Sequence, residues 1–203
     1  PASLSRMDPA MNRRSTSLAC VRFVLSAVVV AAVSPGRATR ALAVDPVVKL
    51  LVGNVAYAPA ATGREQSLDL YGPATPSAGK RPIAIFIHGG GWRHGDKEMV
   101  GEKPAAFVSR GYLFATANYR LERSVSPWEQ AGDVASAVTW LHAHAAEHGG
   151  DPTHIFLVGH SAGAHLVALV GTDERLLAAH GLDLTAVRGV VLLDGAGYDV
   201  PRQ

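Results

Sequence analysis

The chain has 203 residues, of which 48% are hydrophobic and 18% are charged. These values are typical of one folded domain and exclude a disordered, collagen-like or membrane-filling protein. The formal net charge is +2, but residues 1–43 carry an excess of arginine, so the rest of the chain is slightly acidic. The sequence therefore has no basic patch that would indicate nucleic acid as a partner.

Residues 1–43 are predicted to contain an export signal together with residues upstream of it. Met11-Asn12-Arg13-Arg14 gives a positive start, Phe23 to Val33 is an apolar run, and Ala41-Leu42-Ala43 has the small side chains of a cleavage site. The apolar run is far shorter than the roughly 20 residues that cross a bilayer, so we expect no stable membrane anchor. The protein is expected to be secreted or periplasmic after cleavage near Ala43, by either the general or the twin-arginine route.

Short apolar segments alternate with amphipathic ones after the signal. Val52 to Tyr57 and Ser67 to Tyr71 are predicted to be short strands that form an antiparallel hairpin, because a proline and a glycine separate them. Ile83 to Ile87 is a continuous apolar run, as expected of a parallel strand that is buried on both faces.

The second half of the chain continues this alternation. The expected elements are a helix over Lys103 to Arg110, a strand over Tyr112 to Ala117, a helix over Pro127 to His148, a strand over Ile155 to Val158, a helix over Ala162 to Val170 and a last strand over Val187 to Leu193. Apolar residues recur on one face of the long helix, and Gly149-Gly150 follows it. Strands that alternate with helices in this order predict a mostly parallel α/β sheet.

A serine motif follows one of the predicted buried strands. Gly159-His160-Ser161-Ala162-Gly163 opens the next helix, and this is the strand-turn-helix context that a G-x-S-x-G nucleophile requires. Such a tight turn strains the backbone at the serine, and glycines on both sides avoid collisions between side chains. The hydroxyl is then presented at the helix N-terminus, where the N–H of Ala162 can donate to a developing oxyanion. Ser161 is therefore the predicted nucleophile.

A glycine-rich motif, His88-Gly89-Gly90-Gly91-Trp92, comes at the end of the earlier buried strand. Glycines lack a Cβ atom, so their backbone N–H groups can approach a substrate oxygen closely. Gly90 and Gly91 are the expected donors of the oxyanion hole. The residues expected to support the two motifs are His88, Gly89, Trp92, Gly159, His160 and Gly163.

Seven short segments carry a resemblance to a known family. They are Leu68-Asp69-Leu70-Tyr71, His88 to Trp92, Gly95-Asp96-Lys97, Asn118-Tyr119-Arg120-Leu121, Asp133, Gly150-Asp151-Pro152 and Gly159 to His165. In this order they resemble the bacterial α/β-hydrolase carboxylesterases that are similar to hormone-sensitive lipase and to feruloyl and acetylxylan esterases.

This resemblance covers roughly residues 47 to 200. It implies an α/β-hydrolase fold with a mostly parallel, doubly wound sheet and an antiparallel N-terminal hairpin. It also implies a Ser-His-Asp enzyme that forms an acyl-enzyme and needs no metal or organic cofactor. The implied substrates are short-chain esters, either small molecules or groups linked to polysaccharide. An arylformamidase-type amide hydrolase, whose family carries a similar His-Gly-Gly-x-Trp, is the alternative.

The chain departs from the family pattern after Ser161. In that family the triad acid and base lie on loops after later strands, and only about 40 residues follow Ser161. We therefore expect the triad Asp and His to be absent from this chain, and residues 44–203 to be a partial α/β-hydrolase domain without the last strands and helices. Its sheet would end in an exposed apolar edge at Val187 to Leu193, and the fragment alone, or a degenerate remnant, would be inactive.

Several other polar residues are given structural interpretations. His165 lies four residues after Ser161, but a serine in such a turn projects away from its helix, so His165 is predicted to pack rather than to act as the base. Asp194 and Asp199 are predicted to have loop or turn roles, because the family places its acid one strand later. Asp133 is predicted to make a structural hydrogen bond.

The remaining histidines and tryptophans do not indicate a further site. Only His144 and His148 share a helix face and no carboxylate cluster accompanies them, so these histidines, together with 142 and 154, are predicted to be solvated and no metal site is expected. Trp92 and Trp128 remain open between the core and a substrate pocket. The sequence does not indicate the oligomeric state.

Overall fold

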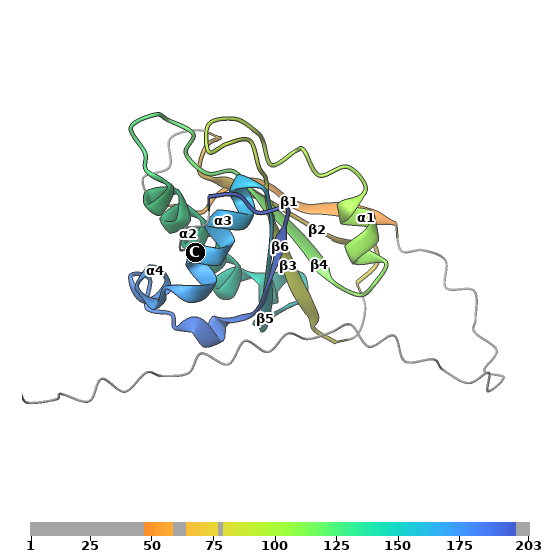
Figure 1. Cartoon of the computed structure of the whole chain (residues 1–203). Helices are drawn as coiled ribbons and strands as arrows, with labels where there is room; N and C mark the ends of the chain where they lie inside the picture. Colours follow the sequence, from red (N-terminus) through yellow and green to blue (C-terminus); the bar gives the residue numbers. More distant parts are fainter. Residues whose placement is uncertain (1–46, 59–63, 77–78, 198–203) are drawn as a thin grey trace, which may run out of the picture. The chain divides into compact units, whose positions relative to one another are not determined.

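A computed structural model describes residues 47–58, 64–76 and 79–197. They form a six-stranded sheet with the order β1-β2-β4-β3-β5-β6, shown in Figure 1. The predicted export signal lies outside the described residues. No helix in the described ranges is long and apolar enough to cross a membrane.

The sheet begins with the predicted antiparallel hairpin. β1 (Val48–Ala56) pairs with β2 (Ser67–Pro73), and β2 also runs antiparallel to β4 (Leu113–Ala117). The predicted antiparallel hairpin of β1 and β2 is therefore confirmed, although β1 is longer than expected and the antiparallel pairing of β2 with β4 was not predicted.

The other strand pairs are parallel. β3 (Arg81–Ile87) lies between β4 and β5 (Gly150–His160), and β5 pairs with β6 (Val187–Leu193). Ile87 is the register partner of Gly159, so β3 and β5 end side by side. This register brings the glycine-rich motif after β3 next to the serine motif after β5.

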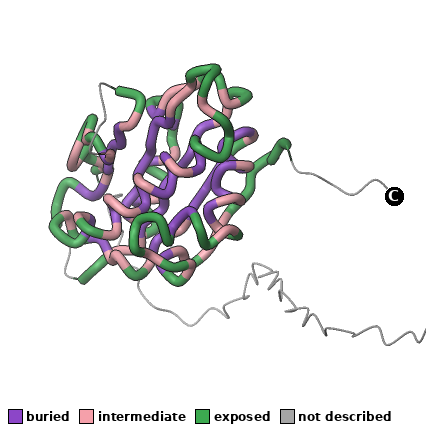
Figure 2. Tube along the Cα trace, turned by 90° about the vertical axis from the view of Figure 1, so that its left-hand side faces the viewer, coloured by how far each residue is buried: buried purple, intermediate pink, exposed green. Residues whose placement is uncertain are grey.

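Helices cover both faces of the sheet. In Figure 1, α1 (Lys103–Val108) lies on one face, and α2 (Pro127–His144), α3 (Ala162–Thr172) and α4 (Glu174–Ala178) lie on the other. The side chains of β3 point alternately to the two faces of the sheet, and each face has its own hydrophobic core. The larger core contains Ile83, Ile85 and Ile87, and the smaller core contains Ala84 and Phe86. Figure 2 shows the buried residues concentrated along the central strands.

The structure corrects the expected bounds of several elements. The long helix ends at His144 and continues as a 3-10 helix, Ala145–His148, before Gly149 takes a left-handed φ of 80°. Gly150, expected to follow the helix as a stop, instead begins β5. α1 ends at Val108, and α4 was not predicted because it has only five residues.

The described sheet ends at β6, which pairs only with β5 among the described strands. Three apolar side chains of this strand, Val191 to Leu193, are 41–46% exposed. The exposed apolar edge expected from the sequence is therefore present in the described part of the chain.

Candidate active site

The backbone turns sharply at Ser161, between β5 and α3. Its φ of 52° and ψ of −119° lie in a region that residues with a side chain seldom adopt, at a cost of about 1–3 kcal/mol. Three hydrogen bonds hold the turn: the Ser161 N–H donates to the Leu193 carbonyl at 2.8 Å, and the Ser161 carbonyl accepts from the N–H groups of Ala164 at 2.9 Å and His165 at 3.3 Å. The strained strand-turn-helix geometry predicted for this motif is confirmed.

The two glycines that flank the serine are required by close backbone contacts. A Cβ atom on Gly159 would lie 2.4 Å from the Gly163 carbonyl oxygen, and one on Gly163 would lie 2.3 Å from the carbonyl oxygen of Ile87. Real Cβ atoms essentially never approach so closely. The absence of side chains lets the start of α3 pack against the end of β3.

The structure brings the two predicted motifs into contact. A Cβ atom on Gly89 would lie 3.0 Å from the Ser161 Cβ and 2.9 Å from the His160 carbonyl oxygen. The backbone of the glycine-rich motif therefore lies directly beside the serine, as an oxyanion hole requires.

Three consecutive residues of this motif have positive φ values: 121° at Gly90, 60° at Gly91 and 62° at Trp92. The Gly90 carbonyl accepts from the N–H groups of Arg93 and His94, which closes the segment into a turn. We call residues 89–94 the oxyanion turn. A Cβ atom on Gly90 would lie 2.0 Å from the His94 carbonyl oxygen, so this position requires glycine.

The predicted oxyanion donors make no other hydrogen bond in the described structure. The N–H groups of Gly90, Gly91 and Ala162 donate to no acceptor among the described residues. An unused N–H beside a nucleophile is available for a substrate oxygen.

His88 supports the turn from inside the protein. It is 2% exposed, its ring stacks on Tyr119 with centroids 4.6 Å apart, and its Nδ1 lies 2.8 Å from the Gly89 carbonyl oxygen. Burial lowers the pKa of His88, so the neutral ring with a proton on Nδ1 is favoured, because that atom faces an acceptor. The Tyr119 hydroxyl in turn donates to the His88 carbonyl at 3.1 Å.

A buried lysine holds the chain where it leaves the oxyanion turn. The Lys97 side chain is fully buried and its ammonium group lies 2.5 Å from the Asp69 carboxylate on β2. The Lys97 backbone N–H donates to the Asn118 side chain at 2.6 Å, and its carbonyl accepts from Thr116 at 3.0 Å. These four residues fix the segment after the oxyanion turn to the sheet. Asp69, Lys97 and Asn118 lie in segments that carry the resemblance to the esterase family, but the sequence did not indicate that they contact one another.

Helix α2 contributes two buried polar side chains. Asp133 accepts from the Arg120 N–H at 3.0 Å and from its guanidinium at 2.8 Å, and it also accepts from Gln66 at 2.8 Å, so its predicted structural role is confirmed. Gln130 donates to the carbonyl oxygens of Trp92 and Arg120 and was not predicted. A signal was available, because Gln130 falls on the apolar stripe of α2, four residues before Val134.

The structure also places His165, which was predicted to pack, and the two tryptophans that the sequence left open. The His165 ring packs edge-on against Trp92 with centroids 5.6 Å apart, as the packing interpretation predicted, and burial lowers its pKa. Trp92 is partly buried and packs on the larger core. Trp128 is 40% exposed and lies under the Arg175 guanidinium, so it is a surface residue.

No described residue completes a catalytic triad with Ser161. The Ser161 hydroxyl makes no hydrogen bond within the described part of the chain. Asp194 is exposed in the turn after β6 with a φ of 49°, and Asp199 lies outside the described residues. The described ranges also contain no group of three side chains that could hold a metal ion.

A cavity of about 440 Å³ adjoins the two motifs at the carboxyl ends of β3 and β5. Its lining residues are Phe86, His88, Gly89, Gly90, His94, Gly95, Met99, Lys103, His160 and Leu193. Much of this lining is apolar, so the cavity can accept an uncharged group next to the oxyanion turn.

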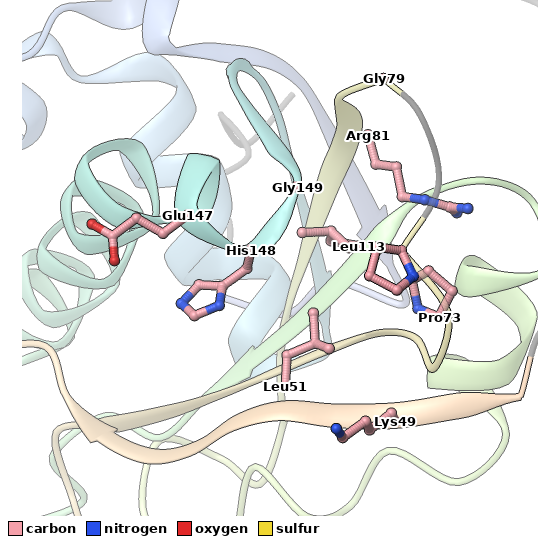
Figure 3. A pocket seen from close by; sticks show the side chains of 10 residues that line it. Lys49, Leu51, Pro73, Gly79, Arg81, Leu113, Glu147, His148 and Gly149 are labelled. Atoms are coloured by element: carbon pink, nitrogen blue, oxygen red, sulfur yellow. The ribbon is translucent and has the colours of Figure 1, made fainter.

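Another cavity, of about 300 Å³, lies at the opposite ends of the parallel strands. Figure 3 shows Arg81 at the start of β3, with Leu51 and Leu113 between it and His148, and the Glu147 carboxylate directed away from them. The seven residues of β3 span roughly 20 Å, so this cavity is remote from Ser161 and is not part of the candidate site.

The sequence is similar to known esterases. The pattern of the BD-FAE family matches residues 68–185. A probable isoprenylcysteine alpha-carbonyl methylesterase of Arabidopsis thaliana is 37% identical over 107 residues, which are 53% of this chain and 22% of that protein. Esterase LipQ of Mycobacterium tuberculosis is 32% identical over 129 residues, 60% of this chain and 29% of LipQ. The chain thus spans less than a third of the length of these curated relatives.

Solved structures of esterases are similar to the described fold. Esterase B of Lactobacillus rhamnosis, inhibited with a tributyrin phosphonate, has a TM-score of 0.59 at 30% identity, covering 72% of this chain and 46% of that one. Esterase 2 of Thermogutta terrifontis, phosphonylated by cyclosarin, has a TM-score of 0.56 at 31% identity, covering 64% of this chain and 52% of that one.

Proposed function

The chain belongs to the BD-FAE family and has the α/β-hydrolase fold, and from this premise we propose that the protein is a serine esterase with Ser161 as its nucleophile. One observation carries the proposal: the oxyanion turn lies against Ser161, and the N–H groups of Gly90, Gly91 and Ala162 have no other acceptor among the described residues. A strained serine beside unused donors is the arrangement that acyl transfer needs.

The proposed reaction has two steps. The Ser161 oxygen attacks the ester carbonyl carbon, and the carbonyl oxygen becomes an oxyanion that accepts hydrogen bonds from Gly90, Gly91 and Ala162. The alcohol leaves with a proton, and the acyl group stays on Ser161 as an ester. Water then attacks this acyl-enzyme and releases the carboxylic acid. We assign the general base and its acid partner to no described residue, because none is bonded to the Ser161 hydroxyl.

We propose short-chain carboxylic esters, free or linked to polysaccharide, as the substrates. The cavity beside Gly89 and Gly90 supports a small uncharged group at this position. Two related structures carry a phosphonate inhibitor or a phosphonyl group, and esterase B was inhibited with a derivative of tributyrin.

The test compares an ester with a formamide. The complete protein that contains these residues is expected to hydrolyse p-nitrophenyl acetate, and Ser161→Ala is expected to lower its kcat by roughly 10⁴-fold or more. N-formylkynurenine is offered in parallel, and cleavage of this formamide alone would instead support the arylformamidase alternative. If the complete protein cleaves neither substrate under conditions where it is folded, the proposal fails.

A further inference from the structure

Gln130 connects helix α2 to the oxyanion turn. Its side-chain nitrogen donates to the Trp92 carbonyl at 2.8 Å and to the Arg120 carbonyl at 2.7 Å, and the residue is 1% exposed. Both hydrogens of the amide are therefore used, and both bonds are shielded from water.

The helix fixes the position of this amide. Gln130 lies in the first turns of α2, whose start is held by a capping box between Ser126 and Glu129. Arg120 is held from the same helix, because Asp133 accepts from both its backbone N–H and its guanidinium. The donor in Gln130 is thus placed by a rigid element rather than by a loop.

Trp92 needs such support because its backbone is strained. It has a φ of 62°, a conformation that a bulky side chain disfavours. Gln130 is the only described residue that donates to its carbonyl. Without this bond, no described hydrogen bond to the Trp92 carbonyl holds the peptide group between Trp92 and Arg93 in its orientation.

That peptide group belongs to the oxyanion turn itself. It carries the N–H of Arg93, which donates to the Gly90 carbonyl at 3.2 Å, and His94 donates to the same oxygen at 3.0 Å. A rotation after Trp92 therefore removes a bond that orients Gly90 and Gly91.

We propose that Gln130 is a positioning residue for the oxyanion hole: acting through Trp92, it holds the N–H groups of Gly90 and Gly91 toward the substrate oxygen. This inference rests on the proposed esterase function. Because Gln130 touches no reacting atom, its loss acts on the transition state and leaves substrate binding largely unchanged.

Kinetics of two substitutions and a matched control test the proposal. Gln130→Leu removes both hydrogen bonds at similar volume and is expected to lower kcat for p-nitrophenyl acetate about 10- to 100-fold with KM unchanged. Thr139→Ala removes a hydroxyl whose bond stays within α2, to the Ala135 carbonyl, and is expected to leave both constants unchanged. Equal kinetics of Gln130→Leu and Thr139→Ala would overturn the proposal.

Gln130→Glu adds a readout that a general loss of packing would not give. An ionised carboxylate would face two carbonyl oxygens, whereas a protonated one can donate a single hydrogen bond. We expect the ratio of kcat in Gln130→Glu to kcat in the wild type to rise as the pH falls. A pH-independent ratio would contradict an action through these carbonyls.

Hydrogen exchange makes the test independent of turnover. The amides of Arg93 and His94 are expected to exchange about tenfold faster or more in Gln130→Leu than in the wild type, and at the wild-type rate in Thr139→Ala. If the wild type hydrolyses no ester, the proposed function fails, and this comparison alone decides whether Gln130 holds the turn. If Gln130→Leu does not fold, Gln130→Asn, which is one methylene shorter, takes its place in both measurements.

Discussion

Gly90 and Gly91 in the oxyanion turn differ in the space that is available for an added Cβ atom. Gly90→Ala would place a Cβ atom 2.0 Å from the His94 carbonyl oxygen, whereas a Cβ on Gly91 meets nothing within 4 Å. We expect Gly90→Ala to lower kcat/KM for p-nitrophenyl acetate by about 100-fold or more, because the turn must rearrange. Gly91→Ala keeps its space and loses only about 1–2 kcal/mol to the left-handed backbone. Equal kcat/KM values for the two variants would contradict this reading of the turn.

Removing one partner of the buried ion pair between Lys97 and Asp69 is expected to destabilise the protein strongly. The Lys97 side chain is fully buried, so Lys97→Met leaves the Asp69 carboxylate buried without its cation. We expect the free energy of unfolding to fall by about 3–5 kcal/mol, measured by urea denaturation at pH 7. Arg175→Gln breaks an exposed ion pair with Asp173 and is the control, with an expected loss below about 1 kcal/mol. Similar losses in the two variants would contradict the assigned burial.

Stability is expected to fall on the acid side because of His88. Burial lowers the pKa of His88 below its usual 6.5, so the unfolded chain binds a proton more readily than the folded one. The free energy of unfolding should therefore be highest above pH 6.5 and decrease as the pH falls through the lowered pKa. Thermal melts of the wild type and His88→Gln between pH 7.5 and about pH 5 measure this. A wild-type slope no steeper than that of the variant would show that His88 is not responsible.

The sequence predicted the residues of the two motifs but not the side chains that hold them. Local sequence patterns identify Ser161 and Gly90, because glycine and serine at these spacings directly after a buried strand are specific for a nucleophile turn and an oxyanion hole. Gln130 and Lys97 act through contacts with residues distant in the chain, and no local pattern states which carbonyl a glutamine will meet. A polar residue on an apolar stripe indicates only that some buried partner exists.

At the scale of elements, buried strands were easier to predict than the ends of helices. Ile83 to Ile87 forms β3 as expected because an apolar run of this length fits a sheet covered on both faces. The sequence predicts that the long helix continues to His148, whereas α2 ends at His144 and Ala145–His148 form a 3-10 helix. The composition of these four residues resembles that of the α-helix before them, so it does not indicate the change. α4 depends on tertiary burial of Leu176 and Leu177, which a five-residue pattern does not indicate.

The start of α2 gives a prediction at this scale. The Ser126 side chain accepts from the Glu129 N–H, and the Glu129 carboxylate accepts from the Ser126 N–H at 2.8 Å. Ser126→Ala is expected to reduce the free energy of unfolding by about 1 kcal/mol, measured by urea denaturation. Ser124→Ala, two residues earlier and outside the cap, is the control and should change it by less than about 0.5 kcal/mol. A loss in Ser124→Ala as large as in Ser126→Ala would argue against the capping box.

At the scale of the whole molecule, the two edges of the described sheet differ. β1 has irregular pairing at two places along its register with β2, and such irregularities hinder the addition of another strand. β6 pairs regularly with β5 from Gly189 to Leu193 and exposes apolar side chains. Among the described strands, β6 therefore presents the edge on which a further strand can pair most readily.

Association through β6 can be tested with two substitutions of equal exposure. Leu192 on β6 and Leu50 on β1 are both 46% exposed. The isolated polypeptide of residues 1–203 is expected to self-associate in roughly the micromolar range or above, and Leu192→Lys should suppress this because a charge on an edge strand opposes pairing. Leu50→Lys adds the same charge to the irregular edge and should leave association unchanged. Sedimentation velocity over a concentration series measures all three proteins, and a wild-type chain that stays monomeric, or equal suppression by both lysines, would show that β6 does not drive association.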